Sequence, residues 1–225
     1  MLHIDHISLG AQNVYEGAYR LCQETGFGQY EGGWFPHAGI ANRIVPLGRD
    51  QYIEVEGVVH PHVIASNPIA KWFYDECAAG DVFLGWCLRV DTREELEEIS
   101  RRLDTEIVDF GLRVRKDGRI TAPARVPESV WCWQRGIPNV FHFEDMDEHA
   151  ARQPCDPPGA VTPQGITWLE VGGTERDLRD YLGEEILALP LRFNGDRPGL
   201  YAMGVATPDG EIEIRRTAVS RFAGD

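Results

Sequence analysis

A strand, a helix and three further strands follow one another in the same order three times along this 225-residue chain. We place the copies at about residues 2–58, 82–146 and 164–216, with residues 217–225 as a C-terminal tail. Repetition of one supersecondary unit in a fixed order indicates a single architecture built by duplication. We therefore expect one domain over residues 1–216, of the α+β class, in which repeated βαβββ modules form curled mixed sheets around a cup.

The expected helix boundaries support this division. Glu95 follows Thr92 by three residues, which is the spacing of a capping box at the start of a helix. Thr174 can cap the third helix, and Gly26 and Gly183 follow the first and third helices, where glycine commonly ends a helix. The expected helices are residues 13–25, 93–103 and 175–182.

Two strands of the first copy carry candidate metal ligands. Side chains alternate between the two faces of a strand, so His6 lies on the polar face of the strand over residues 4–9. Glu54 and Glu56 share the polar face of the strand over residues 51–56. Imidazole and carboxylate together suit Zn²⁺, Fe²⁺, Mn²⁺ or Ni²⁺. We expect His6 and Glu54 to bind such an ion, unless this is only the solvated face of a half-buried sheet.

The later copies offer further candidates. His142 and Glu144 share one strand face, and Phe141 then faces the helix. We predict that His142 or Glu144 completes the metal site. Glu213, on the last strand of the third copy, is a candidate catalytic base, and Glu56 is the other. A register error of one residue would reverse each of these faces.

The candidate substrate contacts are mainly aromatic. Aromatic side chains on one face of the strand expected over residues 129–134 would suit a planar or apolar ligand, although ordinary core packing is the alternative. A glycine-rich turn at residues 32–39 is a candidate substrate wall, and an arginine could clamp a carboxylate. The candidate substrate-binding residues are Trp34, His37, Arg43, Trp131 and Trp133.

Composition narrows the functional classes. A net charge of -14 argues against nucleic acid and anionic membrane surfaces as partners. Five cysteines without a CxxC pair fit reduced thiols in the cytoplasm, and no apolar run is long enough to span a bilayer. The polar segment 148–158 indicates a linker in which His149 is peripheral. We expect a cytoplasmic protein that binds a small molecule, and the sequence is compatible with a homodimer.

Taken in order, several short motifs resemble those of the vicinal oxygen chelate superfamily, and within it those of the glyoxalase-like domain proteins. The resemblance covers nearly the whole chain and implies the repeated βαβββ fold, a divalent metal (Zn, Fe, Mn or Ni), and lyase or isomerase chemistry. The substrate would be a small carbonyl or vicinal-oxygen compound that reacts through an enediolate-like intermediate. The motifs are Asp5-His6-Ile7, residues 39–48, Tyr52-Ile53-Glu54, residues 140–145 and residues 162–166.

The chain departs from the family pattern where a second module would supply a ligand. The second copy offers Gly85 and the third Trp168 at the position of His6. An iron-dependent extradiol-type dioxygenase is one alternative, and it requires His142 to join His6. A metal-free binding protein, like the resistance members of the superfamily, is the other alternative and is favoured by Trp168.

Overall fold

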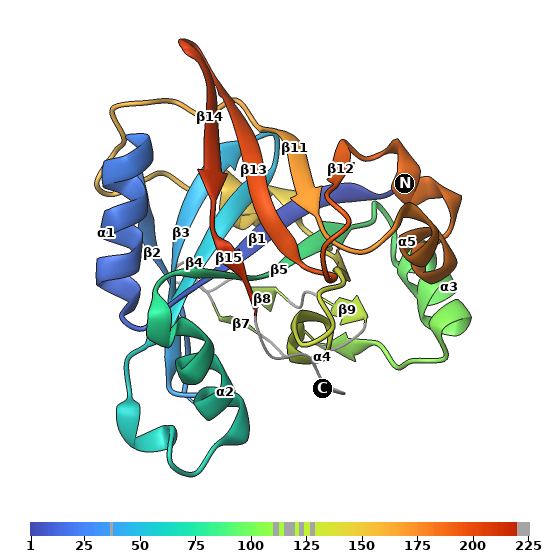
Figure 1. Cartoon of the computed structure of the whole chain (residues 1–225), viewed down its shortest axis with the longest axis horizontal. Coiled ribbons are helices and arrows are strands. Elements are labelled where there is room, and N and C mark those ends of the chain that lie inside the picture. Colours follow the sequence, from blue (N-terminus) through green and yellow to red (C-terminus); the bar gives the residue numbers. More distant parts are fainter. Residues whose placement is uncertain (37, 110–112, 115–119, 122–123, 127–128, 220–225) are drawn as a thin grey trace.

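The computed structural model describes residues 1–36, 38–109, 113–114, 120–121, 124–126 and 129–219 (Figure 1). The prediction for His37 falls outside these residues. None of the helices in the described part of the chain is long and apolar enough to cross a membrane.

The first copy forms a βαβββ unit. The side chain of Asn13 accepts hydrogen bonds from the first-turn N–H groups of its helix, and Gly26, with φ at 74°, ends that helix. The opening strand pairs in parallel with the closing strand, so the spatial order is β2-β3-β4-β1. The elements are β1 (His3–Ala11), α1 (Val14–Thr25), β2 (Tyr30–Phe35), β3 (Ile40–Gly48) and β4 (Gln51–Val58).

The second copy repeats this pairing order. Its strands lie in the order β5-β10-β9-β6, and the opening and closing strands are again parallel. The capping box of Thr92 and Glu95 forms at its helix as expected. The elements are β5 (Val82–Arg89), α3 (Arg93–Leu103), β6 (Val108–Asp109), β9 (Ala124–Val126) and β10 (Asn139–His142). The helix α2 (Pro68–Glu76) and the short paired strands β7 (Arg113–Val114) and β8 (Ile120–Thr121) lie outside this order.

Antiparallel pairing of β1 with β5 joins the two halves into one nine-stranded sheet. The ninth strand, β15 (Thr217–Ala218), pairs with β5, so the expected C-terminal tail begins within the sheet. The sheet has two faces. We call the face that bears His6 and Glu54 the cup face, and the opposite face packs on α1 and α3.

The third copy forms a second sheet with a different pairing. Its opening strand lies between the second and third strands of the copy, in the order β12-β11-β13-β14. This sheet shares one core with the larger sheet, because Leu169 and Met203 belong to the same buried cluster as Ile7 and Ile53 (Figure 1). The elements are β11 (Ile166–Val171), α5 (Glu175–Leu182), β12 (Leu191–Phe193), β13 (Leu200–Thr207) and β14 (Gly210–Arg215).

The expected fold class is confirmed: the chain is a mixed α+β protein with a curled half-barrel sheet and a second sheet. One predicted strand is wrong. Residues 129–134 contain the helix α4 (Ser129–Trp133), not a strand. The reason is tertiary, because Gly85 has no side chain and Trp133 fills the space that a Cβ there would occupy. A run of five residues fits a short helix as well as a strand, and this packing favours the helix.

Candidate active site

An irregularity in β1 brings two adjacent polar side chains together. The pairing of β1 with β5 shifts register between Ile4 and His6, so Asp5 is the extra residue of a bulge. In a regular strand Asp5 and His6 would face opposite ways. Here the Asp5 carboxylate lies 2.7 Å from Nδ1 of His6, and both side chains are buried.

Asp5 contacts a second histidine from a distant part of the chain. Its Oδ1 lies 3.0 Å from Nε2 of His149, which is 1% exposed. Burial alone would raise the pKa of Asp5, but the hydrogen bonds from His149 and His6 outweigh it and hold that pKa well below its usual range. Asp5 is therefore an ionised, buried acceptor for both imidazole rings.

His6 presents its other nitrogen to a carboxylate. Because Nδ1 donates its hydrogen to the ionised Asp5, a neutral His6 carries its lone pair on Nε2. This Nε2 lies 3.6 Å from Oε2 of Glu54, while the Asn42 side-chain amide donates to the other Glu54 oxygen. A proton or a cation between these two acceptor atoms would be attracted to both of them.

Aromatic rings hold His6 in place. Tyr52 stacks on the imidazole with ring centres 4.7 Å apart, and Phe141 meets it edge-on at 5.1 Å. Phe141 therefore lies on the cup face, whereas alternation predicted that it faces the helices. The parallel pairing of β10 with β5 defines this face. Asn139 lies opposite Cys87, which in turn lies opposite His6, and Phe141 is two residues after Asn139 on the same face of β10.

The same register turns His142 away from His6. Val140 packs in the core on the opposite face of the sheet, and His142 is two residues further along the same strand. Glu144 is exposed beyond the end of β10. Glu213 is exposed on the second sheet, 3.0 Å from the guanidinium of Arg215. The structure thus brings His6 and Glu54 together but not these three residues.

Within the described part of the chain, no third metal ligand joins His6 and Glu54. Among the residues that the structure describes, no group of three or more His, Cys, Asp or Glu side chains is placed to hold a metal ion. The donors that do converge, an imidazole nitrogen and a carboxylate, are nevertheless of the kind that divalent transition metals bind. His6 and Glu54 fit as part of a metal site, with the remaining positions left to water or substrate.

Glu56 lies next to this pair on the same face of β4. Burial raises the pKa of Glu56 well above its usual range, and the charge of Glu54 adds to the rise, against smaller opposing effects of Ser8 and Arg125. Its side chain is therefore a buried acid that retains its proton above the pH at which an exposed glutamate loses it. A carboxyl group with a raised pKa is a candidate for proton transfer.

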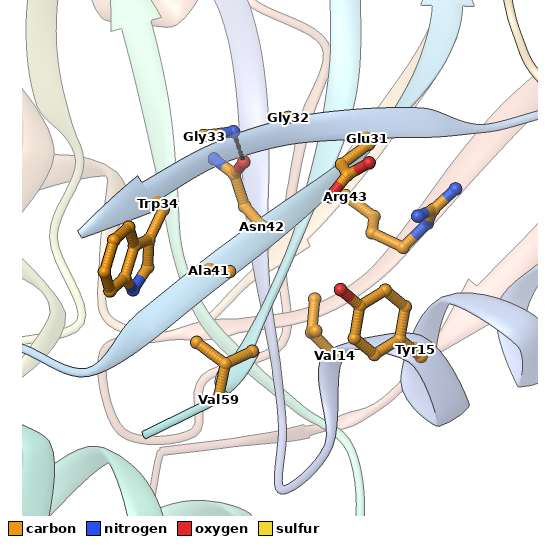
Figure 2. A pocket seen from close by; sticks show the side chains of 10 residues that line it. All are labelled: Val14, Tyr15, Glu31, Gly32, Gly33, Trp34, Ala41, Asn42, Arg43 and Val59. Carbon is orange, nitrogen blue, oxygen red and sulfur yellow. Dashed lines mark hydrogen bonds between the residues drawn. The ribbon is translucent and has the colours of Figure 1, made fainter. Parts of the chain in front are cut away.

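A surface pocket lies beside this site. It has a volume of about 480 Å³ and is formed by α1, β2 and β3, and Trp34 and Arg43 line it as Figure 2 shows. Arg43 is opposite Val55, so it faces away from the cup face. The link between the two places is Asn42, which accepts a hydrogen bond from the Gly33 N–H and donates to Glu54.

The two tryptophans of α4 that were predicted to contact the substrate lie in different surroundings. Trp133 is buried against Gly85, with its ring centre 6.4 Å from that of Trp72. Trp131 is exposed, and the guanidinium carbon of Arg135 lies 4.0 Å from its ring centre. Alternation placed both on one strand face, but on a helix residues two apart point in different directions.

Asp5 and His149 were not among the predicted site residues. Asp5 was missed as a site residue because a bulge cannot be read from an alternating pattern. His149 lies between two 3₁₀ turns, Met146–Glu148 and Ala150–Arg152, in a stretch expected to be a linker. No local signal marks a buried histidine there, and only the Asp-His pair at residues 5 and 6 hinted at an oriented imidazole.

Comparisons with known proteins agree with this fold. The family model of the glyoxalase-like domain matches residues 4–179. The chain therefore belongs to the glyoxalase-like domain family. Among curated proteins, none matches this chain.

Several solved structures are similar in fold. A hypothetical protein from Staphylococcus aureus superposes with a TM-score of 0.54 at 14% identity, over 99% of this chain and 89% of that one. Methylmalonyl-CoA epimerase from Mycobacterium tuberculosis gives 0.44 at 14% identity, over 61% of this chain and 85% of that one. The Streptomyces coelicolor methylmalonyl-CoA epimerase in complex with 2-nitronate-propionyl-CoA gives 0.44 at 10% identity, over 61% and 94%. At 14% identity, the likeness to the Staphylococcus aureus protein concerns the fold alone, and the two lower TM-scores support no conclusion about this chain.

Proposed function

We propose that this protein is an enzyme of the lyase or isomerase type that moves a proton next to a carbonyl group of a small molecule. The observation that carries the proposal is the Nε2 of His6, which Asp5 orients and which faces Glu54 at 3.6 Å. Carboxylates and histidines in such buried, oriented sets are typical of acid–base sites. Substrates that present two neighbouring oxygens fit the family to which the chain belongs.

The same pair supports a divalent metal as cofactor. With bonds of about 2.0 to 2.2 Å, two ligand atoms on one ion lie about 3 to 3.6 Å apart, which matches the separation of His6 and Glu54. A carboxylate that orients the far nitrogen of a metal-binding histidine is a common arrangement, and Asp5 has this position. When bound, such an ion polarises the carbonyl oxygen of a substrate.

Within the chain, Glu56 is the group that we propose to handle the proton. Its raised pKa makes the carboxyl group of Glu56 a better proton acceptor than an exposed glutamate, so it can take up a proton from the substrate and return it. Tyr52 and Phe141 pack against the His6 ring and keep the imidazole oriented. The dioxygenase alternative required His142 beside His6, and the register of β10 gives it no support.

Metal content tests the proposal directly. Protein made in medium supplemented with Mn, Fe, Ni and Zn should contain close to one equivalent of a divalent metal by elemental analysis. His6→Ala should lose the metal and the thermal stability that goes with it, since ligand binding stabilises the folded state. His142→Ala is the matched control and should keep its metal, because His142 lies on the opposite face.

A second candidate function is metal-free binding of a small molecule. The absence of a third protein donor among the described residues favours it. Wild-type protein that contains no metal and whose melting temperature does not change with any divalent ion would overturn the metal-dependent proposal. That result would support the binding function instead.

A further inference from the structure

The hydrogen bonds of His149 define which of its nitrogens carries the hydrogen. Its Nδ1 accepts from the backbone N–H of Ala151 at 3.3 Å, so this nitrogen carries none. Its Nε2–H therefore donates to Oδ1 of Asp5, at 3.0 Å. A neutral His149 thus has a partner on each nitrogen, and the hydrogen that it offers points at the buried carboxylate.

The carboxylate of Asp5 accepts a hydrogen bond from each of two imidazole rings. Oδ1 receives the hydrogen of His149 and Oδ2 receives the hydrogen of His6. The carboxylate is fully buried, and the guanidinium of Arg89 lies 3.7 Å from Oδ1. The rotamer of Asp5 therefore depends on both rings, and a change in the hydrogen bonding of His149 reaches His6 through Asp5.

His149 is held in place by contacts other than its bond to Asp5. Two oxygens of Asp50 accept hydrogen bonds from Arg152 at 2.6 and 2.9 Å, three residues beyond His149. The Tyr30 hydroxyl donates to the backbone oxygen of Ala150 at 2.7 Å. These contacts fix the 146–152 segment against the first βαβββ unit. They therefore hold the Nε2–H group of His149 in position to donate to Asp5.

We infer that His149 is a positioning residue for His6. It holds the carboxylate of Asp5, and Asp5 in turn keeps the hydrogen of His6 on Nδ1 and directs Nε2 toward Glu54. The inference rests on the proposed role of His6 in the active site. Through His149, the 146–152 segment contributes to the chemistry of the first unit, although this segment joins the second and third units.

The test compares two substitutions that differ in one hydrogen-bond donor. His149→Phe keeps a ring of similar size between Tyr52 and Phe143 but cannot donate to Asp5. His149→Gln offers an amide donor at nearly the same reach. In chelator-treated, ¹⁵N-labelled protein at pH 8, wild-type His6 should show a protonated Nδ1 and a bare Nε2. We expect His149→Phe to give a mixture of the two tautomers and His149→Gln to restore the single form.

Metal affinity provides a second readout. His149→Phe should weaken binding of Mn²⁺ or Zn²⁺ by about ten- to a hundredfold, the usual effect of losing an orienting partner. His149→Gln should recover most of it. If His149→Phe does not fold, His149→Asn replaces it, because the shorter amide does not reach Asp5.

The results separate this inference from the proposed function. An unchanged His6 tautomer together with unchanged metal affinity in the variant without a donor would overturn the positioning role. A wild-type protein that binds no metal would count against the proposed function, yet the tautomer comparison would still decide the role of His149. A loss that His149→Gln does not rescue would point to packing alone and would also overturn the inference.

Discussion

At the scale of single residues, Asp5 shows how one irregular position changes the chemistry of its neighbour. The bulge turns Asp5 to the side of His6, and the carboxylate then defines which imidazole nitrogen is free. Glu56 shows the opposite effect, because burial raises its pKa. The pKa values of two acidic residues of the same region are thus shifted in opposite directions for local reasons.

The thiols are expected to be unreactive, and Cys22 allows a quantitative test. Burial raises the pKa of Cys22 to about 11, although the charge of Arg43 acts in the opposite direction. A raised pKa means less thiolate, so about one molecule in a thousand carries it at pH 8. Labelling of Cys22 by iodoacetamide, followed by mass spectrometry, should be slow at pH 8 and should rise steadily to pH 10.

Unfolded protein in guanidinium is the control, and its Cys22 should label at the rate of an ordinary thiol. Rapid labelling of the native protein with a plateau below pH 8 would contradict this expectation. It would identify an activated cysteine and support a nucleophilic role for it.

At the scale of elements, the packing of α1 on β4 depends on a missing side chain. A Cβ on Gly57 would overlap the backbone of Val14, in the first turn of α1. This close approach lets α1 cover the face of the sheet opposite His6 and Glu54. The position of α1 is therefore defined by a glycine in a strand as well as by the apolar side of the helix.

Gly57→Ala should force α1 away from the sheet. We expect the free energy of unfolding to fall by about 1 to 3 kcal/mol, as for other overpacked sites. Gly33→Ala is the control, since the nearest atom to its added Cβ lies 3.8 Å away. Its effect should stay within about 0.5 kcal/mol. Urea denaturation measures both, and equal stabilities of the two variants would show that α1 adjusts without cost.

At the scale of the whole molecule, the third copy departs from the other two in pairing but not in packing. Its opening strand lies inside the sheet order and has no parallel closing strand beside it. Its apolar side chains nevertheless join the core of the first two copies, where Leu169, Met203 and Ile214 are fully buried. We propose that residues 1–216 unfold as one domain because they share this core.

Ile214→Ala tests the shared core. Removing this buried side chain should cost about 2 to 5 kcal/mol and should leave a single unfolding transition. Ile212→Ala, on the same strand but only partly buried, should cost less. Tryptophan fluorescence and circular dichroism should give coincident curves. Two separate transitions in the wild type would show that the third unit is an independent domain.

What the sequence alone determined is local. Alternation placed His6 and Glu54 on one face, and caps such as Thr92 marked the helices, because these signals depend on residues close in the chain. The repeated order of elements was enough for the fold class, and short motifs in a fixed order carried the resemblance to the family, which the comparison confirmed. In the first unit, the strands expected over residues 4–9 and 51–56 lie within β1 and β4.

Only the tertiary structure decided how distant segments meet. The register of β10 put Phe141 beside His6 and turned His142 away, since a shift of one residue reverses every side chain of a strand. The packing of Trp133 against Gly85 favoured a helix over a strand for α4. The 146–152 segment carried His149 to Asp5 across more than 140 residues, and no local pattern encodes such a contact because it depends on long-range packing.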